Sequence, residues 1–158
     1  MQQAIICVGH LKEKFWADAS AEYEKRIGRF ASLEVIEVPD LPEPAHSSPA
    51  IQRQIMEKEG KSILARIRPG DFVAAMCIDA PRMDSEDFAR FVREVADSSR
   101  RLVLVIGGSL GLSGEVVQRA DRKISMSPMT FPHQLARIMT LEQLYRAHKI
   151  NGGERYHK

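Results

Sequence analysis

Residues 102–114 read Leu-Val-Leu-Val-Ile-Gly-Gly-Ser-Leu-Gly-Leu-Ser-Gly, a bare apolar run followed at once by a glycine-rich loop. The apolar run has no polar alternation, which is typical of a strand buried on both faces of a parallel sheet. The four glycines between positions 107 and 114 let a ligand approach the backbone closely. Because α/β proteins bind small ligands where such strands end, the stretch predicts an α/β fold with a site after residue 106.

Outward from this stretch, strand and helix patterns alternate along the chain. We expect strands at 3–8, 33–38, 72–78, 102–106 and 124–126, and helices at 15–30, 51–67, 115–120 and 133–150, with a further helix opening at 84–87. A proline-rich loop at 39–49 separates two of them. The pattern predicts a mainly parallel sheet with helices on both faces, and residues 1–158 are expected to form a single domain.

Three helices carry further information. Phe15, Ala19, Tyr23 and Ile27 form one apolar row, and Gly60 is expected to weaken the middle of the 51–67 helix. The closing helix has more apolar residues than one narrow stripe needs: Leu135, Ile138, Met139, Leu141, Leu144 and Tyr145. It is therefore expected either to pack on a second subunit as well as its own sheet, or to lie deep in a monomer core.

Composition excludes several classes of protein. Of 158 residues, 44% are hydrophobic and 28% charged, which is ordinary for a globular domain, and no apolar run approaches the ~20 residues of a membrane span. Lys12 and Lys14 follow the first apolar run instead of preceding it, so no signal peptide and a cytoplasmic location are expected. Cys7 and Cys77 lack metal-ligand spacing, which predicts two buried, reduced thiols and no zinc.

The charge is unevenly distributed. The net charge is +2, but residues 115–158 hold eight Lys or Arg against four acids, and three of the five histidines. A basic end on a neutral body fits a polyanion such as RNA, although a solvated helix surface explains it equally well.

Two loops, which follow strands expected to be adjacent in the sheet, carry the chemical signal. The glycine loop lacks the Lys-Ser/Thr of a phosphate-binding Walker loop and the spacing and position of a dinucleotide fingerprint, so its backbone is expected to bind a different ligand. In the 125–133 segment, Pro128 and Pro132 stiffen the chain, while Met126, Met129 and Phe131 offer apolar walls for an adenine ring. A rigid crossover turn is the alternative for this segment.

His133 begins the closing helix, where the positive helix end favours a neutral imidazole that accepts a proton near pH 7. A structural role for this histidine is equally open, and Asp79 at a strand end is a weaker candidate. Tyr156, His157 and Lys158 combine a ring, a titratable group and a cation, which suits an unstacked RNA base and its phosphate.

Together these residues resemble one family. Ile106-Gly107-Gly108, the Ser125…Thr130-Phe131-Pro132-His133 segment, Leu144-Tyr145-Arg146-Ala147 and Tyr156-His157-Lys158 resemble the bacterial ribosomal large-subunit pseudouridine N3-methyltransferases (the RlmH family), of the SPOUT class of knotted methyltransferases. The resemblance covers the whole chain.

The resemblance implies methyl transfer from S-adenosylmethionine to N3 of a pseudouridine in helix 69 of 23S rRNA, on the assembled ribosome. It also implies a homodimer, no metal, and a C-terminal trefoil knot that general topology rules argue against. The implied cofactor contacts are Met76, Gly107, Met126, Ser127, Pro128, Met129, Thr130 and Phe131. The implied catalytic groups are His133, Tyr156, His157 and Lys158, the last three facing the partner's cofactor, and Arg155 and Arg137 are assigned to the substrate. Either His133 or His157 is expected to take the N3 proton, and Lys158 and Arg155 are expected to contact phosphate.

Two positions depart from the family pattern. Ser109-Leu110 stands where a proline or acidic residue is common, and Arg155 replaces a common proline. Two other classes of protein stay open: a non-catalytic, ribosome-associated RNA-binding α/β protein, and a Rossmann-type oxidoreductase, which the single glycine after the first strand disfavours.

Overall fold

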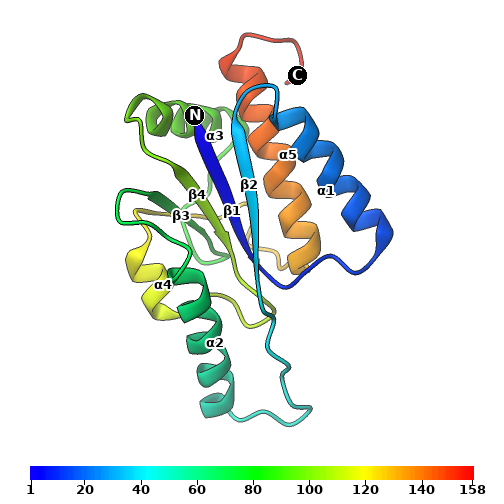
Figure 1. The fold of residues 1–158 in the computed structure, drawn as a ribbon, viewed down its shortest axis with the longest axis vertical. Helices are drawn as coiled ribbons and strands as arrows, with labels where there is room; N and C mark the ends of the chain where they lie inside the picture. Colours follow the sequence, from blue (N-terminus) through cyan, green and yellow to red (C-terminus); the bar gives the residue numbers. More distant parts are fainter.

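A computed structural model describes residues 1–158. One five-stranded sheet, parallel throughout, has the order β2-β1-β4-β3-β5 (Figure 1). The strands are β1 (Gln2–Val8), β2 (Ser32–Val38), β3 (Phe72–Met76), β4 (Leu102–Ile106) and β5 (Arg122–Ile124). The helices are α1 (Lys14–Ile27), α2 (Pro49–Leu64), α3 (Ser85–Asp97), α4 (Gly114–Arg119) and α5 (His133–Asn151).

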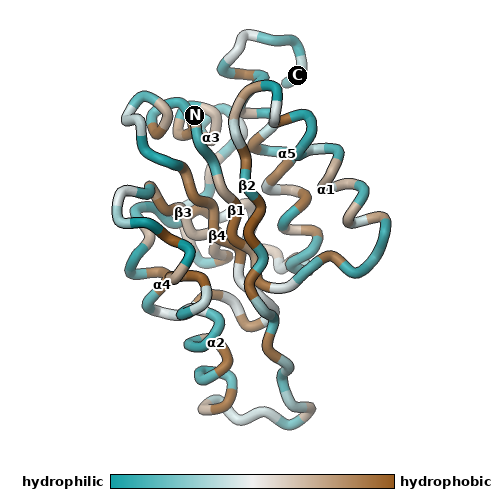
Figure 2. The backbone as a smooth tube through the Cα atoms, in the orientation of Figure 1, coloured by the Kyte–Doolittle hydropathy of each residue, from teal (hydrophilic) through white to brown (hydrophobic).

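Helices cover both faces of the sheet, as the sequence predicted. α1, α3 and α5 share one core with the sheet, and α2 and α4 share a second core on the other face (Figure 1). Hydrophobic residues predominate in the strands between these layers, whereas the helices contain both hydrophilic and hydrophobic residues (Figure 2). Adjacent residues of β4 serve opposite cores: Leu102, Leu104 and Ile106 face one, and Val103 and Val105 the other. Burial of each such side chain contributes about 1.5–3 kcal/mol to the free energy of unfolding. A strand without polar alternation gains this stabilisation on both faces only in a central position that helices cover on both sides.

The structure corrects several expectations about single residues. β3 ends at Met76, and Ile78, expected within the strand, is 51% exposed. Phe15, expected in the apolar row of α1, is 63% exposed and packs on Trp16 instead. β5 ends at Ile124, since Ser125 pairs only with Arg82 in an isolated bridge.

α5 lies within the structure instead of on its surface. It packs against α1 and α3 and contacts β4, and Leu141, Leu144 and Ala147 are fully buried. Part of the broad apolar surface of α5 is therefore buried within the core of a single chain. None of the helices has both the length and the apolar character needed to cross a membrane.

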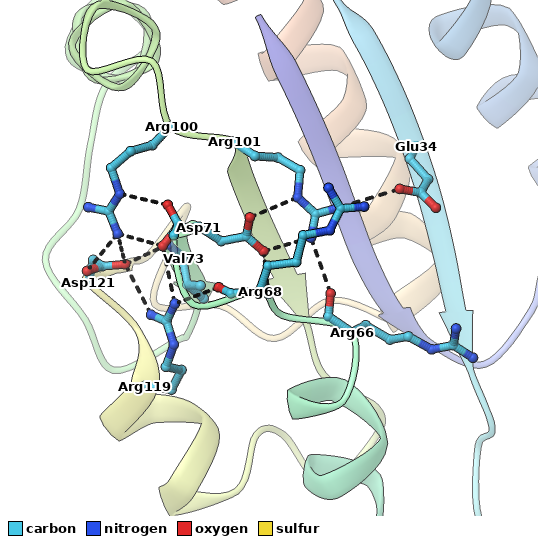
Figure 3. A network of polar contacts seen from close by, with 10 residues as sticks. Glu34, Arg66, Arg68, Asp71, Val73, Arg100, Arg101, Arg119 and Asp121 are labelled. Carbon is cyan, nitrogen blue, oxygen red and sulfur yellow. Dashed lines mark hydrogen bonds and ion pairs between the residues drawn. The ribbon is translucent and has the colours of Figure 1, made fainter.

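An ionic network closes the amino ends of the strands, opposite the glycine loop (Figure 3). Asp71 precedes β3 and Arg101 precedes β4, and both side chains are buried. Arg101 donates to the Asp71 carboxylate through Nε (3.0 Å) and Nη2 (2.7 Å). Asp121, just before β5, accepts a hydrogen bond from Val73 N at 2.8 Å and lies beside Arg100 and Arg119. The network therefore fixes the starts of three strands.

Gly60 has a packing role that its helix propensity does not suggest. It is buried in α2, where α2 crosses α4, and a Cβ at this position would lie 2.2 Å from Ser113 Oγ and 3.0 Å from Ser113 Cβ. Ser113 is also the N-cap of α4, because its hydroxyl accepts a hydrogen bond from Val116 N. The glycine therefore lets α2 approach the cap of α4 and, through it, the end of the glycine loop.

We predict that Gly60→Ala lowers the free energy of unfolding by about 1–2 kcal/mol, because the overpacking cost exceeds the gain in helix propensity. Urea unfolding followed by circular dichroism measures this change. Gly114→Ala is the matched control, since Gly114 is also helical but has open space where its Cβ would be. The double variant Gly60→Ala/Ser113→Gly should recover the lost stability; if it stays as unstable as Gly60→Ala, the contact is not the cause.

Candidate functional site

The loops that follow β3, β4 and β5 surround one hollow of about 860 Å³. β3 lies between β4 and β5, so the two chemically suggestive loops follow strands that are not neighbours, contrary to expectation. They nevertheless line the same cavity. Of the residues assigned to a cofactor, all but Pro128 line it: Met76, Gly107, Met126, Ser127, Met129, Thr130 and Phe131.

The glycine loop folds tightly on itself at the rim of this hollow. Gly111 N donates to Gly108 O at 3.1 Å, and Ser113 then caps α4. A Cβ on Gly107 would lie 2.8 Å from the carbonyl carbon of Gly111 and 2.9 Å from its oxygen, which are both backbone atoms. Only glycine fits at position 107, so the hollow is bounded by bare backbone there.

The segment between β5 and α5 is held by its own serines. Ser125 Oγ donates to Ser127 O at 3.0 Å, and Met129 N donates to Ser127 Oγ at 3.1 Å. Ser125 is buried, whereas Met129 is 68% exposed at the edge of the hollow. The segment therefore presents a fixed backbone and an uncovered apolar side chain to a ligand.

His133 is the first residue of α5 and lines the hollow. Pro132 precedes it and provides no side-chain cap, so the end of α5 leaves its backbone N–H groups beside the cavity. On its other side the imidazole approaches Gly9, at the end of β1: a Cβ on Gly9 would lie 3.4 Å from His133 Nε2. His133 therefore stands between the hollow and the end of β1.

The structure corrects the prediction for Arg137. This side chain, assigned to the substrate, is 2% exposed and points into the protein. Its guanidinium bonds to Glu37 Oε1 at 2.6 Å and to the carbonyl oxygen of Gly9 at 2.8 Å. The arginine ties α5 to β2 and to the end of β1, and its charged group is not available to a substrate.

Two lining residues were missed as site residues. Lys123, in β5, and Cys77, just after β3, both line the hollow together with Asp79. Cys77 is thus only half-buried, whereas full burial was expected. Burial raises its pKa, which the nearby Lys123 charge opposes and Asp79 reinforces, so the thiol stays protonated. Cys7 is fully buried as expected, and burial raises its pKa to about 12.

The last residues of the chain are bound to the middle of their own α5, away from the hollow. Tyr156 Oη donates to Glu142 Oε1 at 3.1 Å, and the Arg146 guanidinium lies 4.7 Å from the centre of the Tyr156 ring. His157 Nδ1 is 3.2 Å from Arg146 Nη1. Burial and the Glu142 carboxylate raise the pKa of Tyr156, so its hydroxyl stays a donor. Glu142 is roughly 13 Å along the helix from His133, so the structure does not bring this segment to its own chain's hollow.

Ion pairing reduces the basic character of the C-terminal third. Arg119, Arg137, Arg146 and Lys149 each pair with a carboxylate. Arg122, Lys123, Arg155 and Lys158 make no ion pair, and the last three are exposed. Fewer cations are thus available to a polyanion than the sequence alone indicates. No three His, Cys, Asp or Glu side chains are arranged to hold a metal ion.

Comparison with known proteins identifies similar chains over the full length. The family model described as "Predicted SPOUT methyltransferase" matches residues 1–157. A relative from Bifidobacterium adolescentis is 46% identical over 159 residues, covering 100% of both chains, and one from Bifidobacterium animalis subsp. lactis is 49% identical over 155 residues, covering 98% of each. Both relatives are named "Ribosomal RNA large subunit methyltransferase H".

Solved structures share the fold at low identity. A probable methyltransferase from Bordetella pertussis has a TM-score of 0.57 at 16% identity, with 93% of this chain and 94% of that chain covered. A TrmH/SpoU tRNA modifying enzyme from A. aeolicus has a TM-score of 0.52 at 18% identity, with 96% and 78% covered. These likenesses show the arrangement of strands and helices alone.

Proposed function

Because this chain belongs to the SPOUT methyltransferases and, within them, to the RlmH family that its sequence resembles, we propose that it transfers a methyl group from S-adenosylmethionine to large-subunit ribosomal RNA. The two relatives carry that RNA in their names. The observation that carries the proposal is the hollow in which bare glycine backbone, an apolar loop and His133 meet. The finer assignment, N3 of a pseudouridine in helix 69 of 23S rRNA on the assembled ribosome, rests on the resemblance, and implies a cytoplasmic protein.

The residues present fit an adenosyl sulfonium. The cavity volume of about 860 Å³ lies within the range of small-molecule sites. Backbone groups of the 125–132 segment are held in place to read the edge of an adenine, and Met76, Met126 and Phe131 form apolar walls for the ring. Gly107 allows close approach from the other side. These residues, with Ser127, Pro128, Met129 and Thr130, are the ones we propose to hold the cofactor.

When bound, S-adenosylmethionine supplies an electrophilic methyl group. The chain must align the acceptor nitrogen, exclude water and take the N3 proton, and we assign the proton to His133. His133 is the first residue of α5 and lines the hollow proposed for the cofactor. Tyr156 and His157 are proposed to position the base, and Lys158 and Arg155 to contact phosphate.

We also propose that the site is completed by a second copy of the chain. Tyr156 and His157 lie beside the middle of α5 and not beside their own His133, which fits a role at the partner's hollow. A mixture of His133→Ala and Tyr156→Ala chains would then form dimers with one intact site, and recover about a quarter of wild-type activity. If light scattering shows that the mixed chains form dimers but no activity is recovered, the two subunits do not share residues at one site.

The trefoil knot of the family is a further proposal. After β5, at the edge of the sheet, the chain returns to its centre, where α5 contacts β4 and packs between α1 and α3. A chain whose ends are joined in the folded state would stay knotted on denaturation. It should then migrate faster in a denaturing gel than a circle of the same chain closed while unfolded.

Two measurements test the proposed function. Titration calorimetry should show S-adenosylmethionine binding without added metal, and mass spectrometry of rRNA from cells lacking the chain should show one missing methyl group. RNA binding without cofactor binding would instead favour the non-catalytic ribosome-associated protein. Binding of NAD(P) in place of S-adenosylmethionine would favour the oxidoreductase.

We predict that Gly107→Ala weakens S-adenosylmethionine binding by at least about tenfold, because the added methyl group forces the backbone of Gly111 to move. Calorimetry measures the dissociation constant directly. Gly114→Ala is the control and should bind normally, because Gly114 ends the same loop, does not line the hollow and has open space where its Cβ would lie. Normal binding by Gly107→Ala would place the cofactor elsewhere.

A further inference from the structure

Two side chains of opposite charge line the hollow. Of the 22 residues around it, one is a lysine or arginine, Lys123 of β5, and one is an aspartate or glutamate, Asp79 in the loop after β3. Both residues are exposed. A ligand in the hollow therefore meets one cationic and one anionic side chain in addition to His133, and otherwise backbone, apolar and neutral polar groups.

The pairing of β3 with β5 directs Lys123 to one side of the hollow. Lys123 is opposite Ala75 in the parallel pair, and Cys77 N continues the pairing by donating to Ile124 O at 2.9 Å. Because side chains alternate along a strand, Lys123 and Cys77 project from the same face of the sheet, whereas Ile124 projects into the core that α5 shares. The face that carries Lys123 is the one covered by α4, whose Val117 also lines the hollow.

Neither charge is neutralised within the chain. Lys123 and Asp79 make no ion pair and no side-chain hydrogen bond, either with each other or with another residue. Burial raises the pKa of the Cys77 thiol, which the Lys123 charge opposes and the Asp79 charge reinforces, so both charged groups lie near this thiol. The lysine and the aspartate are thus close to one residue of the wall, and both are free to bind a ligand.

A ligand that matches this wall carries an anionic and a cationic group close together. S-adenosylmethionine has such a pair at its amino-acid end, where a carboxylate and an ammonium group share one carbon atom. A phosphate of RNA matches the wall less well, because Lys123 would attract it and Asp79 would repel it.

We propose that Lys123 binds the carboxylate, and Asp79 the ammonium group, of the amino-acid end of S-adenosylmethionine. This inference rests on the proposed function, and it gives the cofactor two contacts beyond the backbone and apolar walls assigned to its adenine. Hydrogen bonds between charged groups are about twice as strong as those between neutral ones, so the two side chains would contribute to affinity as well as orientation.

Titration calorimetry with matched ligands tests the role of Lys123 without any methylation. S-adenosylmethionine and its decarboxylated form differ only in the carboxylate, and the wild type should bind the first at least about 10-fold more tightly. In Lys123→Met, which keeps an apolar stem, S-adenosylmethionine should bind about as weakly as the decarboxylated form. Arg122→Met is the matched control and should keep the difference, because Arg122 precedes Lys123 in β5 but lies over the Phe91 ring, 5.0 Å from its centre, and does not line the hollow.

A second pair of ligands tests Asp79. S-adenosylhomocysteine has the amino-acid end and methylthioadenosine lacks it, so Asp79→Asn should weaken binding of the first by about 10-fold and leave the second unchanged. Equal losses for both ligands would overturn the inference, since a general change in the pocket would cause them. Lys123→Met with wild-type cofactor affinity but weaker RNA binding would also overturn it and make the lysine a phosphate contact. If the wild type binds neither S-adenosylmethionine nor methylthioadenosine, the proposed function itself is wrong, and the inference fails with it.

Discussion

Replacing His133 with alanine is expected to slow methylation by a factor of about 10²–10⁴ while leaving the affinity for S-adenosylmethionine within about threefold. The imidazole lines the hollow at the start of α5 but is not part of the glycine loop or the apolar walls. Alanine fits the first turn of a helix, so neither the fold nor the cofactor contacts should change. The loss should therefore fall on the proton-transfer step.

Single-turnover methylation of purified ribosomes, with calorimetry on the same samples, separates the two effects. His46→Ala is a suitable control, since His46 is an exposed histidine in the proline-rich loop. The rate lost in His133→Ala should be least at high pH, where hydroxide takes over the role of the base. Normal turnover in this variant would remove His133 from the mechanism, and loss of cofactor affinity would make it a binding residue.

Those parts of the fold and site that depend on local pattern could be predicted from the sequence. Leu102–Ile106 lacks polar alternation and forms the strand with the expected bounds. Asp84 caps α3 by accepting a hydrogen bond from Asp87 N at 2.7 Å, as its place before an acidic first turn predicts. The glycine loop and the 125–132 segment line one hollow, because parallel strands end at the same edge of the sheet.

Contacts between distant parts of the chain could not be predicted in this way. Arg137 has the sequence context of a helix-surface cation, yet it pairs with Glu37, 100 residues away, in the interior. The position of the Arg137 side chain depends on how α5 crosses the sheet, and the local periodicity of the sequence does not determine that crossing. The close packing of Gly60 against Ser113 is of the same kind. Strand order is a further case, since the insertion of β4 between β1 and β3 leaves no trace in spacing.

A contact between distant residues also gives a large expected effect at the amino ends of the strands, opposite the hollow. We predict that Arg101→Met lowers the free energy of unfolding at pH 7 by about 3–5 kcal/mol, because it leaves the Asp71 carboxylate buried without a partner. The two side chains are 7% and 3% exposed, so water cannot replace the lost bonds. Urea unfolding measures the change. Arg90→Met is the control: its ion pair with Asp87 is exposed, and its loss should cost less than about 1 kcal/mol.

The pH dependence distinguishes a lost ion pair from lost packing. Burial acts to raise the pKa of Asp71, but hydrogen bonds from Arg101 and Arg68 N and the Arg101 charge outweigh it and hold that pKa below its ordinary value. A carboxyl with a lowered pKa stabilises the fold above its unfolded pKa of about 3.9, and this contribution is lost as pH falls through the folded value. Without Arg101, burial should raise the pKa of Asp71, and protonation would then relieve the unpaired charge.

The loss in free energy of unfolding caused by Arg101→Met should therefore become smaller between pH 7 and pH 4. The double variant Asp71→Asn/Arg101→Met should recover much of this loss at pH 7. A deficit that is equally large at both pH values and in the double variant would mean that the packing of the arginine stem, and not its charge, holds the strand starts together.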